Sequence, residues 1–106
     1  MDSFVKRIRE LIKLGEVIIS EHGYDELADD GLSARELLDG VNEAVLIEEY
    51  PDYPKGHCVL LFQKDHEGNP VHVVWGIPKR ADKPAVLVTA YRPSADRWSN
   101  NFLKRR

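Results

Sequence analysis

Four apolar runs, separated by short turn-rich stretches, occupy most of the second half of the chain and most constrain its fold. They cover residues 44–50, 57–64, 71–77 and 85–92. Short apolar runs bounded by Gly, Pro, Asn and Asp are typical of β-strands. The stretches between them span about five to seven residues, whereas a parallel crossover needs about a dozen or more. We therefore expect consecutive strands to pair as antiparallel neighbours.

Helical periodicity marks the beginning of the chain. Apolar residues recur there at the spacing of one helix face: Phe4, Ile8, Leu11 and Ile12. This pattern predicts a helix that Ser3 caps and that Gly15 terminates. Residues 17–20 form a short apolar run, which is either a brief edge strand or an extended link.

Two further helices are expected before the strands. A short one opens at His22 and ends before Gly31. The next begins at Ser33, because Ser33 and Glu36 have the spacing of a capping box, in which each satisfies a free backbone donor of the other. This helix is expected to end near Asn42.

These elements predict an α+β fold, in a single domain over residues 1–106. Two or three N-terminal helices pack on one face of an antiparallel sheet of about four strands. The segment 94–97 has the composition of a helix start, so a short C-terminal helix is expected after the last strand. We expect the C-terminal segment to cover part of the other sheet face, and any functional site to lie on that face.

Charge is divided unevenly along the chain, whose net charge is −3. Residues 1–56 hold 14 acidic and 6 basic side chains, a net of −8, whereas residues 57–106 hold 4 acidic and 9 basic ones, a net of +5. Such asymmetry favours contact with nucleic acid or an acidic partner. The alternative is that these charges lie on solvated surfaces.

The remaining composition limits the class of protein. The apolar runs are too short to cross a bilayer, and the N-terminus lacks the pattern of a signal peptide, so we expect a cytoplasmic protein with no membrane partner. The lone Cys58 cannot form an internal disulfide and is expected in the core. The four histidines lack metal-ligand spacing, and there is no glycine-rich phosphate loop, which argues against a metal or another cofactor.

Polar residues within the apolar strands are the candidates for function. His72 lies in the third predicted strand, and histidine is the usual general acid or base near neutral pH. Strand alternation puts Thr89 and Tyr91 on one face together with Leu87, and Arg92 on the other. Phosphate recognition or phosphodiester cleavage suits this combination. For each residue the alternative is a structural role, such as a hydrogen-bonded strand histidine or ordinary β-propensity.

His22 is a further candidate, because it follows an extended run and precedes a glycine, which places it at a junction. Junctions position functional side chains well. The alternative is a histidine that caps the following helix.

In their order and spacing, several of these segments resemble the bacterial domain-of-unknown-function family numbered 4258. The segments that carry the resemblance are residues 19–22 (Ile-Ser-Glu-His), 31–33 (Gly-Leu-Ser), 45–51, 60–62, 71–74 and 88–93, followed by Trp98. That family is in turn similar to the RelE/ParE-like and BrnT-like toxins, which are small ribonucleases with helices packed on an antiparallel sheet.

The resemblance implies metal-independent cleavage of RNA and a protein partner that neutralises the toxin. His22 and His72 would form the acid–base pair. Tyr91 would contact phosphate or act as an acid. Thr89, Arg92 and Trp98 would bind the substrate. The chain departs from such toxins in being acidic overall and in having Asp29 and Asp30 where the family often has an arginine.

These departures leave other functions open. A non-catalytic module could use the same face to bind a protein or a small ligand. A structural domain that dimerises through the sheet is a third possibility. The position of the two histidines discriminates between them, because catalysis requires both rings in one cleft.

Overall fold

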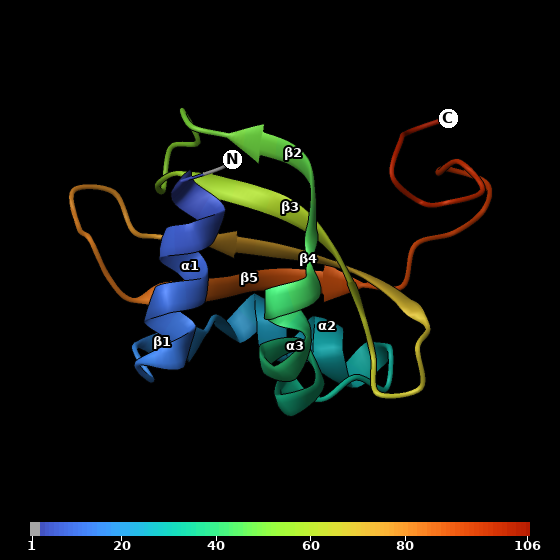
Figure 1. The fold of residues 1–106 in the computed structure, drawn as a ribbon, viewed down its shortest axis with the longest axis horizontal. Coiled ribbons are helices and arrows are strands. Elements are labelled where there is room, and N and C mark those ends of the chain that lie inside the picture. The colour runs from blue at the N-terminus through green and yellow to red at the C-terminus, as the bar shows by residue number, and fades with distance from the viewer. Residues whose placement is uncertain (1–2) are drawn as a thin grey trace.

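The computed structural model describes residues 3–106 and has the predicted α+β class (Figure 1). Its elements in chain order are α1 (Ser3–Lys13), β1 (Val17–Ile19), α2 (Glu21–Asp29), α3 (Ala34–Gly40), the 3₁₀ turn η1 (Val41–Glu43), β2 (Val45–Tyr50), β3 (Cys58–Lys64), β4 (Pro70–Gly76) and β5 (Ala85–Tyr91). The strand order is β1-β5-β4-β3-β2. The four predicted strands form an antiparallel meander from β2 to β5, as expected.

The fifth strand resolves the alternative for residues 17–20 in favour of an edge strand. β1 runs parallel to β5, with Val17 opposite Ala85 and Ile19 opposite Leu87. The sheet is therefore mixed, with a parallel pair at one edge. The long chain between β1 and β5, which includes the whole meander, makes this parallel pairing possible.

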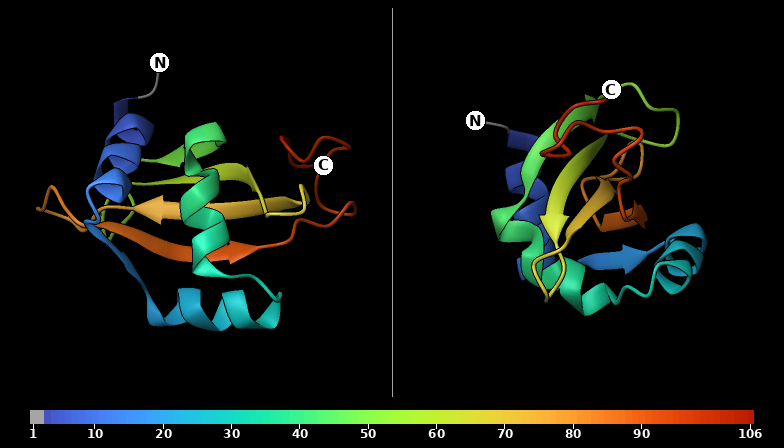
Figure 2. Two further views of the ribbon diagram at one scale, coloured as in Figure 1. Left: turned by 60° about the horizontal axis from the view of Figure 1, so that its bottom comes forward. Right: turned by 90° about the vertical axis from the view of Figure 1, so that its right-hand side faces the viewer.

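Helices α1 and α3 cover one face of the sheet (Figure 2). Ile8 and Leu11 of α1 and Leu37 of α3 are buried there. They share one hydrophobic core with residues of the sheet: Val59, Leu61, Val71, Val73, Trp75, Ala85, Leu87 and Ala90. The predicted capping box is present at the start of α3, where Ser33 Oγ accepts from the Glu36 amide and a Glu36 carboxylate oxygen accepts from the Ser33 amide.

Helix α2 lies along the edge of β5 instead of joining the other two helices on their face (Figures 1 and 2). Ser20 fixes its start, because its amide donates to Leu87 O at 3.1 Å and its hydroxyl donates to Val88 O at 2.9 Å. Gly23 permits the close approach, since a Cβ atom there would lie 2.8 Å from Leu87 O. Two helices therefore cover the sheet face, and the third closes its edge.

A β-bulge in β5 interrupts the alternation of side chains between the two faces, so the predicted alternation is wrong for part of that strand. Val74 pairs with Thr89 but the next pair joins Trp75 to Leu87, so Val88 is an extra residue. Thr89 and Tyr91 do share a face, as expected, but Leu87 points to the opposite one, into the helix-covered core. We call the other side the open face; its register places Cys58, Leu60, Phe62, His72, Val74, Val86, Thr89 and Tyr91 there.

The segment after β5 covers part of the open face, as expected, but it is not helical. The Ser94 carbonyl accepts from the amides of Arg97 and Trp98, which makes one turn. The chain then reverses, and Trp98 forms an isolated antiparallel bridge with Arg105. The prediction of a C-terminal helix is wrong because Trp98 is drawn into contact with His72 in the sheet before a second turn can form.

No helix among residues 3–106 combines the length and the apolar character that a bilayer span requires.

Candidate functional site

His22 lies in the first turn of α2, at the junction with β1, and its side chain is 65% exposed. Its Nε2 atom is 3.4 Å from a carboxylate oxygen of Glu26, one helical turn further on. His22 lines a hollow on the open face, and its exposed side chain can contact a ligand there.

His72 is fully buried in β4. Its Nε2 atom donates to the carbonyl oxygen of Phe102 at 2.8 Å, and Nδ1 accepts from the Tyr91 hydroxyl at 3.2 Å. Burial lowers the pKa of this imidazole below its usual value. A neutral ring with both nitrogens occupied by the protein has the geometry of a structural histidine.

Tyr91 faces His72 across the β4–β5 pair and is partly buried. Burial raises the pKa of its phenol, and its hydroxyl is hydrogen-bonded to the imidazole. Thr89 follows on the same face, partly buried, opposite Val74. In this arrangement Tyr91 orients His72.

Trp98 covers this group from the open side. It is 3% exposed, and its ring meets the His72 ring edge to face at 4.4 Å between centroids. The guanidinium of Arg105 lies 4.8 Å from the Trp98 ring and forms two hydrogen bonds with Glu48 of β2, at 2.8 and 3.0 Å. These contacts fasten the C-terminal segment to both β4 and β2.

Arg92 joins three elements at the end of β5. Its amide and its Nε atom donate to Asp30, which follows α2, and its Nη1 atom donates to Asp65 at 2.9 Å. Asp65 also accepts from the amides of Asn69 and Glu67, and these bonds, with the guanidinium, lower the pKa of its carboxyl to about 2. The charge of Arg92 is therefore matched within the protein.

The structure separates the two predicted catalytic histidines. His72 pairs with Tyr91, whereas the hollow beside His22 begins at the pair of Gly76 and Val86, four residues further along β4. That separation along the strand is about 13 Å. Five of the six predicted site residues gather at one end of β4 and β5, and His22 lies toward the other end.

The hollow beside His22, which we call the His22 hollow, has a volume of about 430 Å³. Its lining is mainly apolar. The lining residues are Ser20, His22, Tyr53, Lys55, Gly56, Cys58, Gly76, Ile77, Pro78, Val86 and Val88. Burial raises the pKa of the Cys58 thiol, which keeps it neutral as part of the apolar floor. Aromatic, cationic and apolar groups thus surround one space of ligand size.

A second hollow of about 440 Å³ adjoins it, and we call it the His57 hollow. Four lining residues, Tyr53, Gly56, Ile77 and Pro78, belong to both, and the others are Phe4, Pro51, Asp52, His57, Lys79, Arg80 and Ala81. Tyr53 lines both spaces and is 49% exposed, so a ligand in either hollow can contact its side chain.

His57 was not among the predicted site residues. Its Nε2 atom donates to a carboxylate oxygen of Glu49 at 2.6 Å, and its ring stacks on Phe4 with 3.6 Å between centroids. The two partners are eight residues apart in sequence. A signal existed in the expected hairpin, because antiparallel pairing of residues 44–50 with 57–64 brings the end of one strand to the start of the next.

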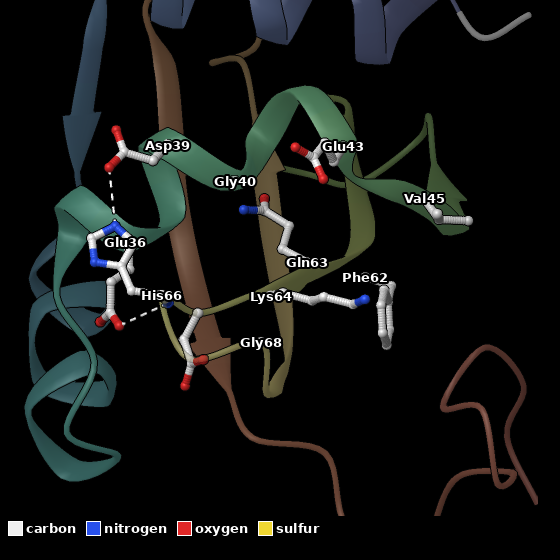
Figure 3. A pocket seen from close by; sticks show the side chains of 11 residues that line it. Glu36, Asp39, Gly40, Glu43, Val45, Phe62, Gln63, Lys64, His66 and Gly68 are labelled. Carbon is white, nitrogen blue, oxygen red and sulfur yellow. Dashed lines mark hydrogen bonds and ion pairs between the residues drawn. The ribbon is translucent and has the colours of Figure 1, made fainter.

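A third hollow, of about 480 Å³, lies between α3 and the β3–β4 turn (Figure 3). Acidic groups line it, among them Glu36, Asp39 and Glu43. His66 bonds to both of the first two, through its amide to Glu36 at 3.2 Å and through its ring to Asp39 at 3.0 Å. Among residues 3–106, no group of three or more His, Cys, Asp or Glu side chains has an arrangement that could hold a metal ion.

Comparison with known proteins identifies the family. No curated protein and no solved structure matches the chain. The model of the family described as "Domain of unknown function (DUF4258)" matches residues 19–92, which include His22, His57 and His72 and end before the C-terminal segment. The chain therefore belongs to the DUF4258 family, as its sequence motifs indicated.

Proposed function

We propose that this domain binds single-stranded RNA at the end of the sheet where the two hollows meet. The observation that carries the proposal is the position of Tyr53, which is 49% exposed and lines both the apolar hollow and the hollow that contains Lys79 and Arg80. Proteins that bind single strands combine aromatic rings, on which bases stack, with cations that follow the backbone.

The cations beside Tyr53 are available to a ligand. Within residues 3–106, no ion pair or side-chain hydrogen bond engages Lys55, Lys79 or Arg80. All three are exposed. Phosphate contact at these positions would not displace an internal partner, in contrast to Arg92, which would have to leave Asp65.

RNA cleavage is the more specific form of this proposal. His22 is reachable in the His22 hollow and would contact the strand as an acid or base. For His72 and Tyr91 to act as acid or base, and for Thr89 and Trp98 to touch substrate, the C-terminal segment would have to move away from the sheet. Binding requires no such movement.

Fluorescence anisotropy with a labelled RNA of about 20 nucleotides tests the proposal. Tyr53→Ala should weaken binding about tenfold, because stacking of one base contributes about 1–3 kcal/mol. Lys79→Ala should weaken it and reduce its salt dependence. Tyr24→Ala is the matched control, since Tyr24 is an exposed tyrosine outside both hollows. Equal affinity for the wild type and Tyr53→Ala would contradict the proposal.

A protein partner is a second candidate, favoured by the edge strand β2. Val45 and Leu46 are exposed large apolar residues on a strand that has a neighbour on one side only. Such an edge can accept a strand from another protein. A neutralising partner bound in this way would slow amide hydrogen exchange across residues 45–50, and Val45→Lys would abolish that protection without changing RNA affinity.

A further inference from the structure

We propose that His57, oriented by Glu49, is the general base of an RNA-cleaving site in the His57 hollow. This inference rests on the proposed function, because it names the reaction for which the RNA-binding surface is built. In this proposal the base is a histidine that bound RNA can reach, in place of the predicted pair of His22 and His72.

The first support is the orientation of the His57 ring. The hydrogen bond from Nε2 to Glu49 is 2.6 Å long, which is short for a charge-assisted bond from an N–H donor to a carboxylate, normally about 2.7–2.9 Å. Stacking on Phe4, with an interplanar angle of 15°, holds the plane of the ring. Among residues 3–106, Nδ1 has no hydrogen-bond partner, so it remains available to a ligand. A histidine whose one nitrogen meets a carboxylate while the other is free has the geometry of a general base.

The other histidines lack this combination. His72 has both nitrogens occupied and is fully buried. His22 is 3.4 Å from Glu26, longer than a strong hydrogen bond. His66 bonds to Asp39 at 3.0 Å but lies in the acidic hollow, where a polyanion would be repelled.

The second support is the placement of cations next to His57. The Ile77 amide donates to the carbonyl oxygen of His57 at 3.1 Å, and the Lys79 amide donates to that of Lys55 at 2.9 Å. These two bonds fasten the 77–80 segment to the loop that carries His57. Lys79 and Arg80 therefore line the same hollow as His57, where they can stabilise negative charge on a phosphate.

The proposed reaction is an attack of the ribose 2′-hydroxyl on the adjacent phosphate. Nδ1 of His57 takes the proton of a ribose 2′-hydroxyl, and the 2′-oxygen forms a bond to the adjacent phosphorus. Lys79 and Arg80 stabilise the charge on the five-coordinate phosphorus. The bond from phosphorus to the 5′-oxygen then breaks, and that oxygen takes a proton from water. The products are a 2′,3′-cyclic phosphate and a 5′-hydroxyl end, and His57 returns its proton to solvent.

The test uses the full chain and an end-labelled RNA of about 20 nucleotides that contains every dinucleotide step, in buffer with a chelator. We expect cleavage that leaves a cyclic phosphate end, and a loss of about 100-fold or more in His57→Ala. Added imidazole should restore part of the activity of that variant. Glu49→Gln keeps the ring and its stack on Phe4, so it should lower the rate without changing the melting temperature.

His66→Ala is the matched control, because it removes a histidine–carboxylate pair of the same kind elsewhere on the surface. It should cleave like the wild type. Affinity for 2′-O-methyl RNA, which cannot be cut by this route, is measured in parallel. RNA that binds but is not cut, or is cut equally by His57→Ala, overturns the catalytic role and leaves RNA binding intact. If 2′-O-methyl RNA does not bind, the proposed function itself fails, and this inference with it.

Discussion

His72 Nε2 donates a 2.8 Å hydrogen bond to the main-chain carbonyl oxygen of Phe102, so a buried histidine of the sheet fastens the C-terminal segment to the open face. This bond requires a proton on Nε2, and the bond from Tyr91 requires an unprotonated Nδ1. The neutral ring satisfies both conditions. Protonation of Nδ1 would therefore remove the acceptor of the Tyr91 hydroxyl and bury a charge.

This arrangement predicts a loss of stability in mild acid. Burial holds the pKa of folded His72 below the unfolded value of about 6.5, so the unfolded chain binds the extra proton first. The stabilisation is fully present above about pH 6.5 and declines as the pH falls toward the folded pKa. Urea denaturation at about pH 7.5 and about pH 5.5 measures it. In His72→Gln the difference between the two pH values should shrink; an unchanged difference would assign it to other groups.

Removal of Trp98 should both destabilise the domain and expose His72. The indole is 3% exposed and lies against the imidazole, and Trp→Ala changes at buried sites cost about 3–5 kcal/mol. With the cover gone, the pKa of His72 should rise toward its usual value, because desolvation is the main cause of its shift. Urea denaturation and an NMR titration of the His72 ring measure the two effects. Tyr24→Ala, at an exposed aromatic residue, should change neither.

The elements of the fold could be predicted from the sequence because apolar periodicity and turn residues report local structure. The bulge could not, since Val88 and Thr89 are both favoured in strands and nothing local marks either as the extra residue. The prediction of a C-terminal helix was wrong for a related reason. Its start signal at Ser94 does produce one turn, but the contact of Trp98 with His72 is long-range and outweighs local propensity.

The candidate site was predictable only in part. The sequence identified His72 and Tyr91 as polar residues in apolar strands, and the structure brings them together, as partners of each other. Whether such a residue contacts a substrate or another part of the protein depends on the C-terminal segment that covers it. Sequence periodicity does not predict where that segment lies. The pair of His57 with Glu49 required the register of a hairpin, which is set by tertiary pairing.

Asp65 should be more important for stability than the other carboxylates of surface ion pairs. It accepts from two backbone amides, from the Asn69 side chain and from Arg92, so Asp65→Asn removes a charge that four donors share. Its folded pKa of about 2 lies below the unfolded value of 3.8, and its contribution should therefore be lost as the pH falls from 3.8 toward 2. Acid unfolding monitored by circular dichroism should begin at higher pH values and lack this component in the variant. Asp39→Asn, in exposed pairs with Arg35 and His66, should cost less than about 1 kcal/mol.

Gly56 should tolerate no side chain, because it lines both hollows and packs tightly against the backbone of the 77–80 segment. Its φ is +137°, and a Cβ atom there would lie 2.1 Å from Ile77 O and 2.7 Å from the Lys79 amide nitrogen. Both atoms are backbone, so relief would require the 77–80 segment to move away from the loop that carries His57. We expect Gly56→Ala to lower the free energy of unfolding by about 3 kcal/mol and to reduce RNA affinity.

Gly68→Ala is the matched control for this change. Gly68 also has a positive φ, +84°, but a Cβ atom there meets nothing within 4 Å. Only the backbone strain remains, which is about 1 kcal/mol, and RNA affinity should stay at the wild-type value. Urea denaturation and anisotropy on both variants separate the steric contribution from the conformational one. Equal losses of stability in the two variants would show that the 77–80 segment yields without cost, and that the packing around Gly56 does not hold the hollows in place.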